Sequence, residues 1–116
     1  MRSVTRYSIE KESLGDMIEA RRFNPCLEIS FRDRKGKHTQ KLSVGYGDEL
    51  HVFREGEYTF VLCQNPRLGY IGLEVFMGEE KAGDIFLEHH QVIEVLGRDD
   101  LAPHTIITRL KEYLLF

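Results

Sequence analysis

The segment from Tyr58 to Cys63 reads YTFVLC and is apolar at almost every position. Successive side chains of a β-strand point to opposite faces, so Tyr58, Phe60 and Leu62 would share one face. Val61 and Cys63 would lie on the other. Leaving either set in water would forfeit about 1.5–3 kcal/mol for each large side chain. The segment therefore predicts a central strand that other parts of the chain cover on both faces.

Further strand-like runs precede and follow this strand, and turn residues such as Gly, Pro, Asn and Asp separate them. Apolar residues alternate in these runs, except in the first, where the alternation is not clean. The runs lie at residues 3–9, 26–32, 37–44, 50–53, 70–77, 84–88 and 91–96. Asp33 and Gly36 suit a tight hairpin turn between two of them. We expect a mainly antiparallel, strongly curved sheet of about six strands arranged as a meander.

Leu14, Met17 and Ile18 recur at the i, i+3 and i+4 spacing that is typical of an amphipathic helix. Ser13 can serve as the N-cap. The pattern predicts a short helix that ends at residue 21 or 22, ahead of Pro25, because the residue before a proline disfavours helical geometry.

The residues from Leu101 to Leu114 carry the clearest helical pattern, with Asp100 as a candidate cap and Pro103 in the first turn. The predicted apolar stripe consists of Ile106, Ile107, Leu110, Tyr113 and Leu114. This stripe would cover the second face of the central strand. The sequence as a whole predicts one α+β domain spanning residues 1–116.

The composition is that of an ordinary globular protein, since 41% of the 116 residues are hydrophobic and 30% are charged. The formal net charge of -3 argues against a nucleic-acid binder that uses its whole surface. The start of the chain has no apolar core of the signal-peptide kind, and no run approaches the length of a membrane span. With Cys26 and Cys63 expected as buried thiols, these features predict a cytoplasmic protein without a membrane span.

Basic residues gather around the predicted turn at Asp33. The candidate contacts are Arg32, Arg34, Lys35, Lys37 and Lys41. Such a cluster can bind phosphates of a nucleic acid or of an anionic lipid headgroup. Charged residues at a hairpin end are also what solubility and the protection of a sheet edge require, and this interpretation is the favoured one. Both interpretations remain open from the sequence.

Glu88 and His90 would share one strand face if the last run continued through them, and His51 could supply a third ligand for a divalent metal ion. A small metal-dependent enzyme centred on Glu88 and His90 is therefore one hypothesis. The spacing matches no recognised metal motif, so no metal is favoured and no cofactor is expected.

The favoured hypothesis is a small non-catalytic protein that acts as a protein-interaction or regulatory module. Leu115 and Phe116 lie off the apolar stripe of the last helix, which makes them candidates for an interface with a protein partner or a second copy. Glu79 and Glu80 are expected to form an acidic pole opposite the basic turn, and this asymmetry could orient a partner. Phosphate binding through the basic turn is the alternative.

Overall fold

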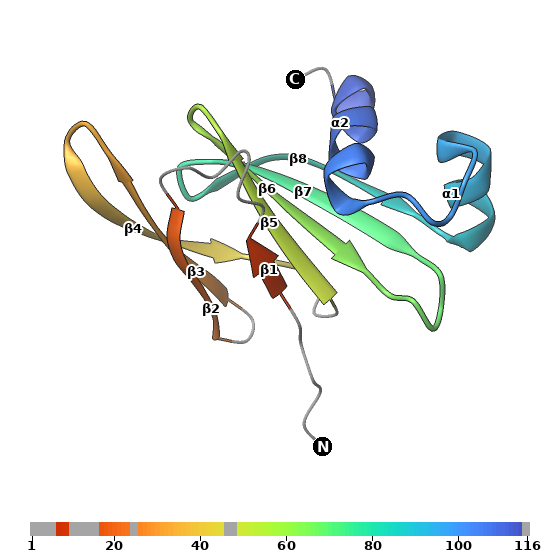
Figure 1. Cartoon of the computed structure of the whole chain (residues 1–116), viewed down its shortest axis with the longest axis horizontal. Coiled ribbons are helices and arrows are strands. Elements are labelled where there is room, and N and C mark those ends of the chain that lie inside the picture. Colours follow the sequence, from red (N-terminus) through yellow and green to blue (C-terminus); the bar gives the residue numbers. More distant parts are fainter. Residues whose placement is uncertain (1–6, 10–16, 24–25, 46–48, 115–116) are drawn as a thin grey trace.

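The computed structural model describes residues 7–9, 17–23, 26–45 and 49–114. This part of the chain forms eight strands and two helices, stacked in three layers (Figure 1). The strands are β1 (Tyr7–Ile9), β2 (Met17–Phe23), β3 (Cys26–Asp33), β4 (Gly36–Ser43), β5 (Glu49–Glu55), β6 (Tyr58–Gln64), β7 (Ile71–Met77) and β8 (Glu80–Leu87). The helices are α1 (His89–Leu96) and α2 (Pro103–Leu114).

The strands form two sheets rather than the single meander that the sequence predicts. One sheet has five strands in the order β1-β5-β6-β7-β8, and the other has three in the order β2-β3-β4. Neighbouring strands are antiparallel except β1, which runs parallel to β5. The α+β class and the antiparallel hairpins are confirmed, whereas the continuous curved sheet is wrong. The smaller sheet covers one apolar face of the five-stranded sheet. β4 therefore belongs to the smaller sheet and does not continue into the larger one.

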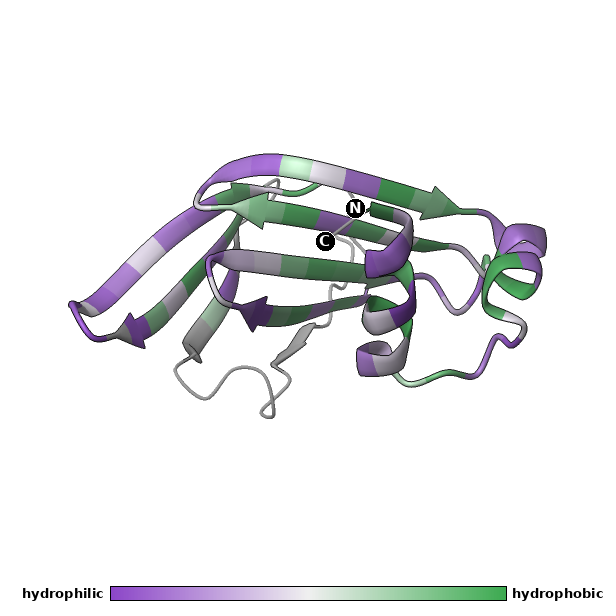
Figure 2. Ribbon diagram, turned by 90° about the horizontal axis from the view of Figure 1, so that it is seen from above, coloured by the Kyte–Doolittle hydropathy of each residue, from purple (hydrophilic) through white to green (hydrophobic). Residues whose placement is uncertain are grey.

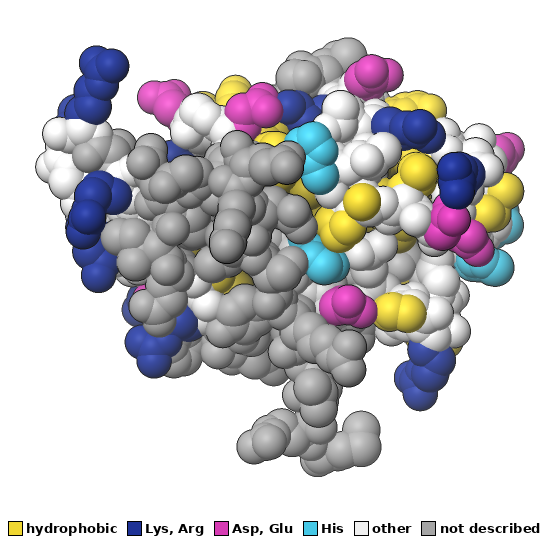
Figure 3. All heavy atoms as spheres, viewed as in Figure 1, with side chains coloured by type: hydrophobic (Ala, Val, Ile, Leu, Met, Phe, Trp, Pro, Cys, Tyr) yellow, Lys and Arg dark blue, Asp and Glu magenta, His cyan; other side chains and the backbone are white. Residues whose placement is uncertain are grey.

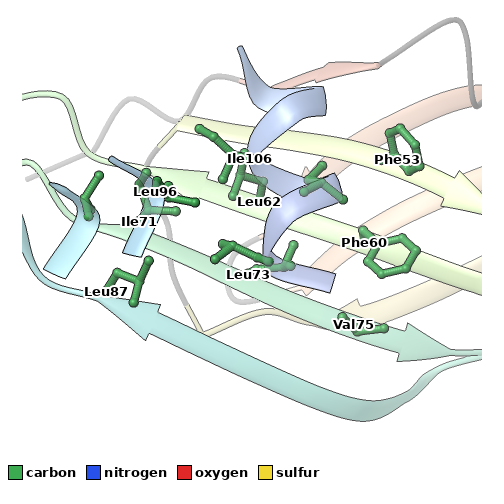
Figure 4. Close-up of a cluster of buried hydrophobic side chains, with 12 residues drawn as sticks. Phe53, Phe60, Leu62, Ile71, Leu73, Val75, Leu87, Leu96 and Ile106 are labelled. Atoms are coloured by element: carbon green, nitrogen blue, oxygen red, sulfur yellow. The ribbon is translucent and has the colours of Figure 1, made fainter. Parts of the chain in front are cut away.

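The first hydrophobic core lies between the five-stranded sheet and the helices, and Figure 4 shows its side chains meeting beneath α1 and α2. The sheet contributes Phe60, Leu62 and Leu73, which are almost fully buried. From α2 come Ile106, Ile107 and Leu110, each at most 1% exposed. The predicted packing of the last helix is confirmed for these three residues.

Two details of that helix differ from the prediction. Tyr113 is 57% exposed, so the stripe ends before it, and Leu114 only packs against the margin of the core. Asp100 is not the residue that precedes α2, because the helix begins at Pro103, and its carboxylate instead accepts two hydrogen bonds from Arg98 at 2.8 Å. Both described helices are too short to cross a membrane.

The second core lies between the two sheets. Val61, Cys63 and Phe76 on the larger sheet face Leu27 and Ile29 on the smaller one. Figure 2 shows the hydrophobic residues concentrated in these central strands. Both cysteines are free thiols, with Cys63 buried and Cys26 half-buried. The central strand β6 is therefore covered on both faces, as its sequence predicts.

The predicted helix near residue 14 is wrong over the part that the structure describes. Met17–Phe23 is the strand β2, which pairs with β3 from Met17 opposite Phe31 to Phe23 opposite Cys26. Residues 13–16 lie outside the described residues. Pairing with a neighbouring strand outweighs the local helical spacing here, because secondary-structure propensity is only a weak preference.

The predicted strand at residues 91–96 is also wrong, since these residues belong to α1. The backbone N–H of Glu88 donates to the side-chain oxygen of Gln91 at 3.0 Å, which forms part of a capping box. At the other end the N–H of Gly97 donates to the carbonyl of Ile93. Val92 and Leu96, one helical turn apart, are the buried residues of α1. This burial selects the helix over the strand that β-branched residues favour.

A buried carboxylate joins the two sheets. Glu74 of β7 is 1% exposed and lies on the face that packs against the smaller sheet. Its two oxygens accept hydrogen bonds from the backbone N–H of Gly45, at 3.0 and 3.1 Å. The ammonium of Lys81 on β8 lies 2.7 Å from one of them. Glu74 thus fixes the segment after β4 against β7, with its charge balanced by Lys81.

We expect Glu74→Ala to reduce the free energy of unfolding by about 2–4 kcal/mol, because it removes a buried carboxylate that pairs with Lys81 and accepts from the Gly45 N–H. Urea denaturation would measure this. Asp84→Ala is the matched control, since Asp84 lies opposite Glu74 on β8 but is exposed. Equal losses in the two variants would contradict the structural role of Glu74.

Candidate functional site

The hairpin of β3 and β4 extends away from the body of the molecule (Figure 1). Residues 32–41 of this hairpin are called the basic hairpin here. The predicted cations Arg32, Arg34, Lys35, Lys37 and Lys41 are all exposed. Figure 3 shows Lys and Arg side chains along the end of the molecule that carries it. Arg32, Arg34, Lys35 and Lys37 lie at or next to the turn, whereas Lys41 lies farther along β4, opposite Glu28. A binding role for these cations stays a prediction.

Two of the cations face each other directly. Arg32 pairs with Lys37 in the register of the hairpin, on the face turned away from the second core. Like charges at opposite positions of a strand pair destabilise it. Within the described residues, Arg32, Arg34 and Lys37 have no ion pair or side-chain hydrogen bond. Their positive charge is therefore available to a binding partner.

The base of the basic hairpin is fixed to the larger sheet through Phe31. This ring is 5% exposed and stacks on His38, with the ring centres 5.3 Å apart. The guanidinium of Arg54 on β5 lies 3.6 Å from the ring centre of Phe31. Arg54 also donates to the hydroxyl of Thr59 and to the carbonyl of Gly56, at 3.2 and 3.0 Å. This side chain therefore couples the base of the hairpin to the β5–β6 turn.

Acidic residues lie beside the basic hairpin, not at the opposite pole as predicted. The backbone N–H of Lys41 donates to a carboxylate oxygen of Glu79 at 2.7 Å. Glu79 and Glu80, called the acidic turn here, are exposed at the connection between β7 and β8. Figure 3 shows Asp and Glu side chains next to the Lys and Arg side chains at this end. Positively and negatively charged side chains therefore lie close together on this surface.

A cleft of about 260 Å³ lies at the other end of the larger sheet, where β6 passes into β7 and α1 begins. Its lining includes the apolar residues Ile71 and Val92, which are buried. Tyr70 forms part of the wall, and its ring also lies 5.1 Å from that of Phe86. The polar and charged side chains of the lining are Glu49, Gln64, Asn65, His89 and Asp99.

The wall of the cleft requires glycine at position 69. Gly69 has a φ of +79°, and a Cβ added there would lie 2.8 Å from Cδ2 of His89. The turn that holds Gly69 is closed by its own N–H, which donates to the carbonyl of Asn65 at 2.7 Å. The side chain of Asn65 accepts from the N–H of Leu68 at 2.7 Å. His89 is thus packed against a well-ordered turn at the mouth of the cleft.

The acidic groups near the cleft differ in their pairing. The side-chain hydrogen bond from Arg98 holds the pKa of the exposed Asp100 carboxyl below its ordinary value and raises the pKa of Arg98 itself. Glu49 and Asp99, in contrast, make no ion pair or side-chain hydrogen bond within the described part of the chain. Two carboxylates of the lining therefore remain available to a ligand.

The three candidate metal ligands do not gather at one point. Glu88 precedes α1 and His90 is its second residue, so the assumed strand geometry is wrong. Nδ1 of His90 lies 3.8 Å from a carboxylate oxygen of Glu88, and both side chains are exposed. His51 lies on β5, three strands away from β8, the strand that Glu88 follows. Among the residues that the structure describes, no group of three or more His, Cys, Asp and Glu side chains could hold a metal ion.

The two remaining candidates, Leu115 and Phe116, lie outside the described residues, so their proposed interface stays a prediction. Sequence reasoning did not identify the cleft. Its polar residues come from β5, β6, the β6–β7 turn, α1 and the segment before α2. The only sequence signal was the turn at Asn65 and Gly69, which explains a change of chain direction but not a site.

Comparisons of the chain with protein-family models, with curated proteins and with solved structures find no match.

We expect Gly69→Ala to destabilise the protein by at least about 1 kcal/mol more than Gly78→Ala. Both changes place a side chain at positive φ, which costs roughly 1–2 kcal/mol, but only the first meets a neighbour, since a Cβ at Gly78 has open space. Urea denaturation of both variants measures the difference. Adding His89→Ala to Gly69→Ala should recover part of the extra loss, and a failure to do so would contradict the assigned contact.

Arg54→Lys should destabilise the protein by about 1–2 kcal/mol, because an ammonium cannot reproduce the planar contact with Phe31 or the paired hydrogen bonds. Amide hydrogen exchange should become faster in β3 and β4 while α2 keeps its protection. Arg67→Lys, in an exposed turn, provides the control. Unchanged exchange in the basic hairpin would show that Arg54 does not hold it.

Proposed function

We propose that this chain is a non-catalytic protein-interaction module that docks its basic hairpin on an acidic patch of a protein partner. The supporting observation is the Arg32–Lys37 pair, two directly opposed cations without a described counter-charge, with Arg34 and Lys35 in the turn that joins their strands. Opposed like charges cost stability in the free protein. Carboxylates of a partner would remove that cost and add charge-assisted hydrogen bonds.

The acidic turn favours a protein over a nucleic acid or an anionic membrane. A uniformly negative surface that contacts Lys41 would also approach Glu79, whose carboxylate accepts from the Lys41 N–H. Such a surface would be repelled by the acidic turn, and the net charge of -3 adds to that repulsion. A protein surface can present opposite charges side by side, and complementary patterns of this kind confer specificity.

The attachment of the hairpin also supports a binding role. Arg54 holds Phe31 at the base of the hairpin, so the cations at its end are carried by paired strands instead of a loose loop. Binding then requires less ordering of the backbone, and this preorganisation lowers the entropic cost of association.

Self-association through the C-terminal end of α2 is a second candidate. It is favoured by Tyr113, a large side chain that is 57% exposed next to the half-buried Leu114. This contact would not involve the basic hairpin. Analytical ultracentrifugation of the wild type and of Tyr113→Ser would separate it from the main proposal, because only this contact makes the oligomeric state depend on Tyr113.

The test of the main proposal is site-specific crosslinking followed by reconstitution. A photocrosslinking amino acid replaces Lys35 at the end of the hairpin, and in a control protein it replaces the exposed Glu112 on α2. Both are irradiated in native extract with and without nuclease. We expect a protein adduct from position 35 that is absent from position 112 and resists nuclease.

The partner is then purified and titrated with charge-reversal variants. Arg34→Glu should weaken binding by at least about tenfold, in line with loss of an interfacial charge pair. Arg67→Glu makes the same charge change in another exposed turn and should leave the affinity unchanged. Equal weakening by both variants would overturn the proposal. Binding of duplex DNA or anionic vesicles that depends on Arg34 would instead establish the phosphate-binding alternative.

A further inference from the structure

The cleft at the β6–β7 turn carries an inference that does not depend on the basic hairpin. We infer that it binds a small ligand with an alkylguanidinium group. Three features of the cleft favour such a ligand, namely the charges of its lining, the origin of its polar groups and its apolar floor.

The first feature is the negative charge of the cleft lining. Glu49 and Asp99 line the cleft, and no Lys or Arg is found among the described residues of its lining. The nearest arginine in the sequence, Arg98, is held by the carboxylate of Asp100 through two hydrogen bonds at 2.8 Å. It is therefore not available to neutralise Asp99. The lining presents two carboxylates without a described cation, so a positively charged ligand is favoured.

The second feature is the placement of the hydrogen-bonding groups on separate elements of the cleft. Glu49 and Gln64 are opposite each other on β5 and β6, whereas Asp99 comes from the segment between the helices. The side chains of Glu49, Gln64 and Asp99 make no hydrogen bond within the described part of the chain. Acceptors on separate elements suit a donor group that is flat and branched. A guanidinium offers five N–H donors in one plane, whereas an ammonium is a compact point charge.

The third feature is the apolar part of the lining, which would contact the apolar part of the ligand. Ile71 and Val92 are 5% and 1% exposed and form the buried part of the lining. The ring of Tyr70 stands at the same cleft, and a guanidinium can stack on such a ring. The volume of about 260 Å³ is below the range of drug-sized pockets, about 300–1,000 Å³. A short alkyl chain with one cationic head group therefore matches the cleft better than a larger molecule.

The wall opposite the sheet keeps this space open. Gly69 and His89 are in close contact, and any larger residue at position 69 would push the ring of His89 away from the turn. The exposed ring of His89, the first residue of α1, therefore lines the cleft close to this turn. Its unpaired nitrogens are further polar groups of the lining, since His89 has no hydrogen bond within the described residues.

The experiment is a titration of the isotope-labelled full chain, followed by two-dimensional amide NMR. The probe is n-butylguanidine, and n-butylurea is its neutral control of nearly the same shape. We expect saturable shifts at Asn65, Gly69, Tyr70 and Ile71, with a millimolar dissociation constant because the ligand has few atoms. Butylurea should give no saturable shift. Equal binding of both probes, or of neither, would overturn the inference.

Variants then locate the binding. Glu49→Gln combined with Asp99→Asn should weaken butylguanidine binding by about tenfold, as expected for two charge-assisted hydrogen bonds at a partly exposed site. Glu94→Gln combined with Glu112→Gln removes the same charge from exposed helix positions and should not change the affinity. Equal weakening by the two double variants would overturn the assignment to the cleft. If the first double variant does not give the spectrum of a folded protein, the two single variants replace it. Each should then show a smaller loss of affinity for butylguanidine.

The source of the guanidinium is distinguished by two further probes. Agmatine represents a free small molecule, and Nα-acetyl-arginine methylamide represents an arginine within a protein. Binding of agmatine alone assigns the cleft to a free metabolite, and binding of both assigns it to an exposed arginine side chain as well. The Arg34→Glu variant should bind every probe as the wild type does, so this outcome is separate from the fate of the basic hairpin.

Discussion

The fold depends on a sheet that is apolar on both faces. β6 places Phe60 and Leu62 on one side and Val61 and Cys63 on the other, and all four are at most 1% exposed. Neither face can be left in water without losing stability comparable to that of a whole domain. The helices cover one face and the three-stranded sheet covers the other, so the chain needs both covers. Between the two sheets, the buried carboxylate of Glu74 on β7 accepts from the N–H of Gly45, just after β4, and so links the smaller sheet to the larger one, while the exposed Lys81 on β8 balances its charge.

The elements that could be predicted are those whose signal is local and repeated. The hairpin turn at Gly36, the central strand and the buried stripe of α2 follow from alternation, turn residues and helical spacing. Two segments with mixed signals were misassigned. Met17 and Ile18 have helical spacing with Leu14 but belong to β2, which pairs with β3, and Val92, Ile93 and Val95 are β-branched but belong to α1. In both, contacts with distant parts of the chain decide the outcome, and no window of neighbouring residues contains them.

The same distinction separates the two candidate sites. The cations of the basic hairpin are neighbours in the chain, so the sequence alone brings them together. The cleft joins Glu49, Gln64, His89 and Asp99, which become neighbours only when β5 pairs with β6 and α1 closes over the end of the sheet. The contact of Arg54 with Phe31 was equally invisible in the sequence, because it connects the two sheets. A cluster of charges that are close in the chain can thus be predicted from the sequence. The contacts that hold the cluster in place, and a cleft built from distant segments, cannot.

The parallel pairing of β1 with β5 has a consequence for the order of folding. Tyr7 pairs with Leu50, and the whole three-stranded sheet lies between them in the chain. Closing so large a loop costs entropy, whereas the hairpins of β3 with β4 and of β5 with β6 close over short turns. The hairpins therefore form first, and β5 remains an open edge until β1 docks on it. The protein has to pass through a state with an unpaired strand edge, where association with other chains competes with completion of the sheet.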